Sequence, residues 1–151
     1  MDNNIPAVKS VYTLNEKTGY PFGVGDTIDI IIEMTHNVSV VQIPSLLLSL
    51  EGIQKTAYYH PPVNFQPGDP ISKLWFTYDI QIGDIAQPLD YLSVDSLIGD
   101  IRRWTIYTPT LVANLKLAPP ASPGSLAFCC NIQIDSSKPY VDSLIPLKRI
   151  G

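Results

Sequence analysis

The chain has 151 residues, of which 45% are hydrophobic and 16% are charged, so wholesale disorder is excluded because a core can form. Lys and Arg number 10 against 14 Asp and Glu, and the net charge of −4 argues against nucleic-acid binding. No segment approaches the roughly 20 apolar residues of a membrane-spanning helix, and the opening MDNNIPAV does not read as a signal peptide.

Alternation of apolar and polar residues predicts strands in chain order, separated by turns rich in Gly and Pro. The predicted strands cover residues 8–13, 27–34, 38–41, 46–50, 55–59, 73–80, 111–117 and 126–134. Residues 90–103 are the least regular part, and we expect a loop there with a helical turn. Seven or eight short strands of this kind predict an all-β fold, an immunoglobulin-like antiparallel two-sheet sandwich with an extended C-terminal strand.

The period of two assigns one face of each strand to the core. In segment 27–34 this inward set is Ile28, Ile30, Ile32 and Met34. In segment 73–80 it is Leu74, Phe76, Tyr78 and Ile80, in segment 111–117 Leu111, Ala113, Leu115 and Leu117, and in segment 126–134 Leu126, Phe128, Cys130, Ile132 and Ile134. We therefore expect a sandwich at 8–134, a linker or junction with a preceding module at 1–7, and a linker with an inter-module strand at 135–151.

The two ends of the chain echo each other. The residues Asp2, Pro6, Val8 and Ser10 recur in register as Asp135, Pro139, Val141 and Ser143. This pattern is typical of a repeat boundary, in which a Pro-stiffened linker precedes the first strand of another module. The tail carries the apolar residues Val141, Leu144, Ile145 and Leu147. It is expected either to join a neighbouring module or copy, head to tail, or to fold back on its own domain.

Five segments carry a family resemblance: GVGDTIDIIIEM, VSVVQIPSLLLSLEG, KLWFTYDIQIGDIAQPLDY, LKLAPPASPGSL and IQIDSSKPYV. Together they resemble the Ig-like, cadherin-like tandem repeats of large cell-surface adhesin or fibre proteins in bacteria and unicellular eukaryotes. The resemblance implies an extracellular or cell-surface location, adhesion or scaffold work, and calcium at module junctions. Two stretches depart from the family pattern, the proline-rich 58–72 and residues 95–110, and they put any metal ligand of the latter in doubt.

Four aspartates are candidate calcium ligands because they fall in turns or at the linker: Asp26, Asp84, Asp90 and Asp135. Asp2 and Glu33 are further candidates. The competing interpretation is that these carboxylates serve as turn and capping groups, since Asp is common in that role.

Two further features concern surface chemistry. Asn37 begins the one permitted Asn-x-Ser/Thr sequon and is the candidate glycosylation site, although the motif often goes unused. Cys129 and Cys130 are adjacent in a predicted strand, so we expect an exposed thiol at Cys129 and a buried one at Cys130. A bridge from Cys129 to another chain is the rival hypothesis.

No catalytic motif is recognisable, and we expect a protein that is not an enzyme. The leading hypothesis is a structural module that assembles head to tail with copies of itself or with neighbouring Ig-like modules. The second hypothesis is a carbohydrate-binding module that uses exposed aromatic residues. Its candidates are Trp75, Trp104, Tyr58, Tyr59 and Tyr107, with Trp75 first because it falls on the predicted outer face.

Overall fold

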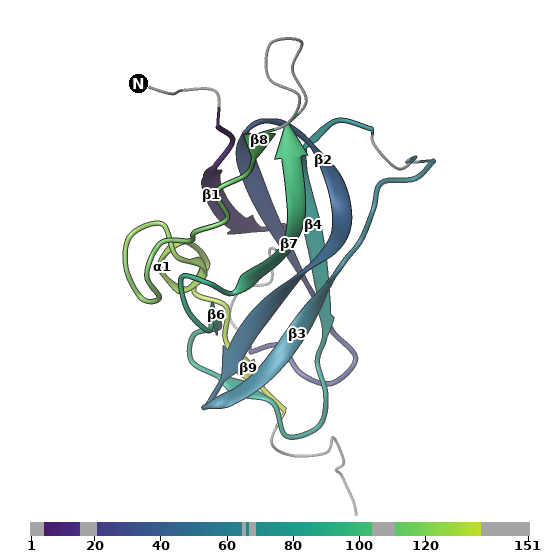
Figure 1. Cartoon of the computed structure of the whole chain (residues 1–151). Coiled ribbons are helices and arrows are strands. Elements are labelled where there is room, and N and C mark those ends of the chain that lie inside the picture. The colour runs from purple at the N-terminus through teal and green to yellow at the C-terminus, as the bar shows by residue number, and fades with distance from the viewer. Residues whose placement is uncertain (1–4, 16–20, 65, 67–68, 104–110, 137–151) are drawn as a thin grey trace, which may run out of the picture.

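The structure is a computed structural model that describes residues 5–15, 21–64, 66, 69–103 and 111–136. It is all-β apart from one short helix (Figure 1). The strands are β1 (Val8–Thr13), β2 (Thr27–Leu50), β3 (Ile53–Tyr59), β4 (Ile71–Asp79), β5 (Ile85–Ala86), β6 (Asp90–Tyr91), β7 (Leu97–Arg103), β8 (Leu111–Val112) and β9 (Ile134–Asp135); the helix is α1 (Leu126–Cys130). The general prediction of an antiparallel all-β fold is confirmed.

Strand β2 is 24 residues long and organises the domain. It runs the length of the molecule, bends over at one end and returns (Figure 1). Its first half, 27–38, pairs with β1 and β4, and its second half, 39–50, pairs with β3, β6 and β7. Three separate strands were predicted at 27–34, 38–41 and 46–50. They are one strand because β-bulges absorb the bend without ending the pairing.

The two halves of β2 lie in different layers of a sandwich-like fold. Strand β3 joins the layers along one side, since it pairs with both β2 and β4. On another side, a bridge between Ala7 and Asn114 links the segment before β1 to the segment after β8. The described strands therefore wrap around one hydrophobic core, which contains side chains from both halves of β2.

The alternation within β2 and β4 is confirmed. Each of the eight inward residues of segments 27–34 and 73–80 is at most 5% exposed. A period-two pattern sustained over a long segment has few other ways to bury its apolar side chains, which explains why it was reliable here. Ile31 is also buried, at 6% exposure, although it falls on the opposite face of β2.

The strand predicted at 126–134 is wrong in its first part. Residues Leu126–Cys130 form α1, which begins at Ser125, whose Oγ accepts a hydrogen bond of 3.2 Å from the Phe128 amide. The helix ends at Asn131, whose φ of 46° is left-handed. Phe128 is consequently 63% exposed and not inward. A short apolar run fits either period, and here the capping residues decided for the helix.

Two other segments also differ from expectation. Residues 90–103 contain β6 and β7 instead of a loop with a helical turn. Strand β8 covers Leu111–Val112 and does not continue to 117, although Ala113 and Leu117 are buried as predicted. In the described part of the chain, no helix is long and apolar enough to cross a membrane.

The bend of β2 brings Pro44 against Gly99 of β7. A Cβ atom added to Gly99 would lie 2.9 Å from both Cα and Cβ of Pro44. Pro44 is buried and rigid, so the backbone of β7 can lie this close only because residue 99 has no side chain.

Gly99→Ala is therefore expected to lower the free energy of unfolding by about 1–3 kcal/mol, since the added methyl group overlaps a ring that cannot move aside. The matched control is Gly23→Ala, where the new Cβ would meet only the Asp135 carbonyl oxygen, at 3.8 Å. The control is expected to change stability by less than about 0.5 kcal/mol. Equal stability of both variants in urea unfolding would show that the Gly99–Pro44 contact does not exclude a side chain at residue 99.

Candidate functional site

The chain enters the described domain at what we call the N-terminal pole, formed by residues 5–7, 35 and 114. The Pro6 carbonyl oxygen accepts a hydrogen bond of 2.8 Å from the Asn114 amide. The Ala7 amide donates to Thr35 Oγ1 at 3.0 Å, and the Thr35 amide donates back to the Ala7 carbonyl oxygen at 2.8 Å. Pro6 was predicted to contact another module, and the structure places it buried against its own domain.

The chain leaves the domain at the C-terminal pole, formed by residues 22–26, 81–84 and 134–136. Here β9 lies between β5, its antiparallel partner, and Phe22, which forms a parallel bridge with Ile134. The Asp135 amide donates to the Phe22 carbonyl oxygen at 2.9 Å, and the Ser136 amide donates to that of Asp84 at 2.8 Å. Ordered pairing thus continues two residues into the range predicted as the linker, 135–151.

Asp84 is the central side chain of the C-terminal pole and is 5% exposed. Its Oδ2 accepts hydrogen bonds from the Tyr78 hydroxyl and, at 2.9 Å, from the Gln81 amide. Lys55 Nζ lies 3.7 Å from its Oδ1. Burial, followed by the hydrogen bond and the negative charge of Asp84, raises the pKa of the Tyr78 phenol. Both carboxylate oxygens therefore have protein partners that hold the turn 81–84 against β3 and β4.

Two of the other predicted calcium ligands, Asp26 and Asp90, have comparable local roles. Asp26 Oδ2 accepts from the Gly23 amide at 3.0 Å, which closes its own turn. Asp90 is 8% exposed and accepts from the Tyr91 amide at 2.9 Å and from the Ala121 amide at 2.7 Å. Asp135 is exposed in β9. Within the described residues no three His, Cys, Asp or Glu side chains form a group that could hold a metal ion. A junction site would take ligands from two modules, so calcium stays a prediction.

Asn37 lies in β2 between Glu33 and Val38, where the pairing with β4 shifts register. Its side chain is exposed whereas those of its neighbours Val38 and Ser39 are buried. Glycosylation at Asn37 stays a prediction that this exposure permits. The expectation of two free thiols is wrong, because Cys129 and Cys130 are joined to each other by a disulfide.

The aromatic candidates divide into two groups. Trp75 is half-buried: its Nε1 donates to Asp29 Oδ1 at 2.9 Å, and its ring centroid lies 4.0 Å from that of His60. The ring of Tyr59 packs edge-on against Phe76, and burial raises the pKa of its phenol. Tyr58, by contrast, is 68% exposed. Trp104 and Tyr107 lie outside the described residues. Among the candidates that the structure describes, Tyr58 and not Trp75 is the aromatic side chain that is open to a ligand.

Sequence reasoning missed one feature of the C-terminal pole. Two aliphatic side chains of its turns are exposed, Val24 at 53% and Ile82 at 68%, and so is Ile53 at 58%, which begins β3. Each lies beside a Gly in a turn, the one signal that could have placed it near a turn. The predicted contacts Asp2, Pro139, Val141, Leu144, Ile145 and Leu147 lie outside the described residues.

The Tyr78–Asp84 pair makes the free energy of unfolding depend on pH in the alkaline range. The folded-state pKa of Tyr78 lies above its ordinary value of 10.0, so the unfolded chain loses this proton first and stability falls as the pH rises above that value. Tyr78→Phe is expected to lower the neutral-pH free energy of unfolding by about 1–3 kcal/mol, because Asp84 loses a buried donor, and to flatten the alkaline decline. Urea unfolding across the pH range measures both effects.

The control for this prediction is Tyr58→Phe, which removes a hydroxyl from an exposed side chain. It should leave the neutral-pH stability within about 0.5 kcal/mol of the parent. An alkaline decline as steep in Tyr78→Phe as in the parent would contradict the role given to this phenol.

Comparison with known proteins adds no relative to this picture. No protein-family model, no curated protein and no solved structure matches the chain. The features of the chain that bear on its function are the two poles, the carboxylates that hold their turns in place and the exposed side chains.

Proposed function

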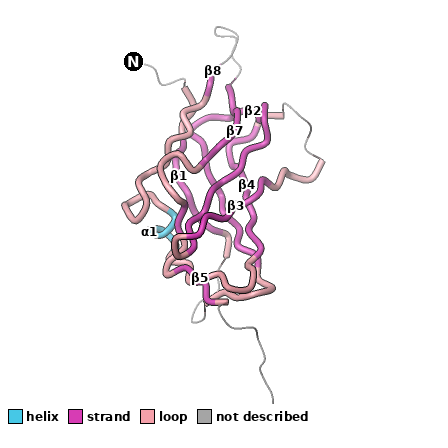
Figure 2. The backbone as a smooth tube through the Cα atoms, turned by 60° about the horizontal axis from the view of Figure 1, so that its bottom comes forward, coloured by secondary structure: helices cyan, strands magenta, loops and turns pink. Residues whose placement is uncertain are grey.

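We propose that the chain is a non-enzymatic, extracellular structural module with an immunoglobulin-like sandwich fold, which joins end to end with modules of its own kind. One observation carries this proposal. The described chain enters at the N-terminal pole and leaves at the C-terminal pole, at opposite ends of the long axis in two views (Figures 1 and 2). A module of this shape can be connected in series without folding the chain back along its side.

The similarity between the two ends of the chain can be compared with the structure of β1. The four apolar positions of the β1 segment are matched, 133 residues later, by the apolar positions of the tail. The pairs are Val8 with Val141, Val11 with Leu144, Tyr12 with Ile145, and Leu14 with Leu147. Val11, at 4% exposure, is the most buried residue of β1 and pairs with Ile32 of β2. The tail therefore has the pattern needed to fill the β1 position of a following module, or to take that position in a neighbouring copy in place of the copy's own residues 8–13.

The exposed aliphatic side chains of the C-terminal pole support an end-to-end contact. Val24 and Ile82 lie in two turns of this pole, and Ile53 begins β3, whose Lys55 contacts Asp84 of the same pole. A linked module would cover them and remove apolar surface from water, which stabilises the junction by about 25 cal/mol per Å² buried. Calcium shared between modules and a glycan on Asn37 belong to the same proposal.

The register of β1 supplies a direct test of where the tail lies. Ser10 pairs with Glu33 across β1 and β2, and the tail residue that matches Ser10 is Ser143. In a background with Cys129 and Cys130 replaced by Ser, we expect Glu33→Cys with Ser143→Cys to form disulfides between chains on mild oxidation. Denaturing gel electrophoresis should show a ladder of covalent multimers.

Two controls accompany this test. Glu33→Cys with Ser10→Cys should give a bond within one chain, and Gln54→Cys with Ser143→Cys should give no ladder, because Gln54 lies on β3. If the Glu33→Cys, Ser143→Cys chain forms only an internal bond, the tail folds back on its own domain and the end-to-end account fails.

Association should also depend on the apolar residues of the tail. Val141→Ser with Leu144→Ser is expected to weaken self-association at least about 10-fold, since each side chain is worth about 1.5–3 kcal/mol when fully buried. The matched control is Asp142→Ser, because the corresponding β1 residue, Lys9, is exposed. Sedimentation velocity over a concentration series measures the change. An equal effect of the control would show that the tail acts through charge and not through a strand face.

A further inference from the structure

A hollow of about 200 Å³ opens beside the exposed ring of Tyr58 on β3 and β4. Tyr58 and Thr77 are direct partners across these strands, so they stand next to each other in its wall. The remaining wall includes Lys55, Thr56, Asp79 and Gln81. The hollow is therefore bordered by one aromatic ring and by side chains that both donate and accept hydrogen bonds.

The charges of this hollow restrict what it can bind. Lys55 contributes one ammonium and Asp79 one carboxylate, so the wall has no excess of either sign to attract a phosphate or a metal cation. Lys55 is also held 3.7 Å from the carboxylate of Asp84, which further offsets its charge. Asp79 Oδ1 accepts a hydrogen bond of 2.6 Å from Thr27 Oγ1, which orients the carboxylate. A ligand suited to this wall is neutral and has several hydroxyl groups.

We infer that this hollow binds one unit of a neutral saccharide. The C–H face of a pyranose ring stacks on the negative face of the Tyr58 ring, as aromatic side chains attract edges that carry partial positive charge. The hydroxyl groups bond to Asp79, Gln81 and the threonines, so the few polar groups orient the ligand while the ring supplies contact area. Binding at one exposed ring in a small hollow is weak, with a dissociation constant on the order of 1 mM.

A second, larger hollow is less suited to such a ligand. It measures about 310 Å³ and lies between the turn at Glu51 and Gly52 and the segment near Pro120. Its tyrosine, Tyr91, is 1% exposed, and its carboxylate at Asp90 already accepts two backbone hydrogen bonds. It offers no free aromatic face among its described lining residues.

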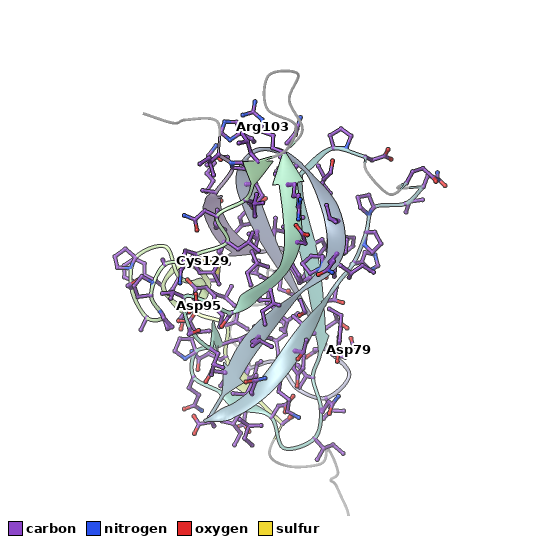
Figure 3. The ribbon with its side chains drawn as sticks, viewed as in Figure 1. Asp79, Asp95, Arg103 and Cys129 are labelled. Carbon is purple, nitrogen blue, oxygen red and sulfur yellow. A yellow bond between two sulfur atoms is a disulfide. The ribbon has the colours of Figure 1, made fainter. Side chains whose placement is uncertain are left out.

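Saccharide binding and the proposed strand contact use different strands of the domain, and of the residues that line the hollow only Gln81 belongs to the C-terminal pole. The hollow takes its residues from β3, β4 and the turn after β4, whereas the proposed strand contact uses β2 beside β1. Asp79 lies on the side of the domain opposite Cys129 and α1 in the view of Figure 3. Each proposal can therefore fail without the other.

The experiment titrates the isotope-labelled chain with soluble neutral trisaccharides of glucose, mannose, galactose and N-acetylglucosamine, and follows backbone amide resonances. We expect saturable shifts at Thr56 and Thr77 with at least one of the four. Tyr58→Ala should lower the affinity at least about 10-fold, because the stacking face is lost, and Asp79→Asn should lower it less. The matched control is Phe128→Ala, which removes a ring of similar exposure, 63% against 68%, from α1 and should leave the affinity unchanged.

Two results would overturn the inference. One is the absence of shifts with all four sugars at concentrations up to about 10 mM, well above the expected dissociation constant. The other is an affinity of Tyr58→Ala equal to that of Phe128→Ala. Because Tyr58 is exposed, neither variant is expected to unfold the chain, and the unchanged amide spectrum of each variant away from its substitution checks this.

Discussion

The path of β2 is the constraint on which the rest of the domain depends. This one strand runs from the C-terminal pole to the N-terminal pole and back, so each of its halves supplies the central strand of a layer. Strands β1, β4, β3 and β7 take their positions by pairing with it. The bend has to satisfy sheet hydrogen bonds on both sides of a change in direction, which is what the bulges and the side-chain-free Gly99 allow.

The same path fixes where the chain begins and ends its contribution to the sheets. Thr35, near the top of the bend, bonds to Ala7 and so holds the incoming segment at one pole. The backbone carbonyl oxygen of Asp26, just before β2, accepts a hydrogen bond from the Ile80 amide and helps hold the turns of the other pole together. The two poles thus lie at opposite ends of the domain because β2 is long enough to span it. Modules joined in series through these poles would therefore be aligned along the axis of β2.

How much could be predicted from sequence differed between long and short segments. The inward residues of β2 and β4 followed from alternation alone, because a long segment offers many positions that must agree. The continuity of β2 did not, since separate strands were predicted at 38–41 and 46–50, and Gly99, which makes room for Pro44 between them, is remote in sequence. The prediction for Leu126–Cys130 was wrong for a different reason. Five residues fit the period of a strand and that of a helix equally well, and only the capping residues Ser125 and Asn131 distinguish the two.

The candidate site shows the corresponding limit for function. The sequence placed Asp26 and Asp84 at turns correctly and Asp90 wrongly, since Asp90 lies in β6. Residue type alone could not tell a ligand from a side chain that holds its own loop in place. Burial decides between these roles, because a buried carboxylate needs several donors and the nearest ones are backbone amides and the Tyr78 hydroxyl. Exposed side chains that do not hold a turn or the core in place are the ones available to contact a partner. At the C-terminal pole and beside β3 these are Val24, Ile82 and Tyr58, none of which depends on the core for its position.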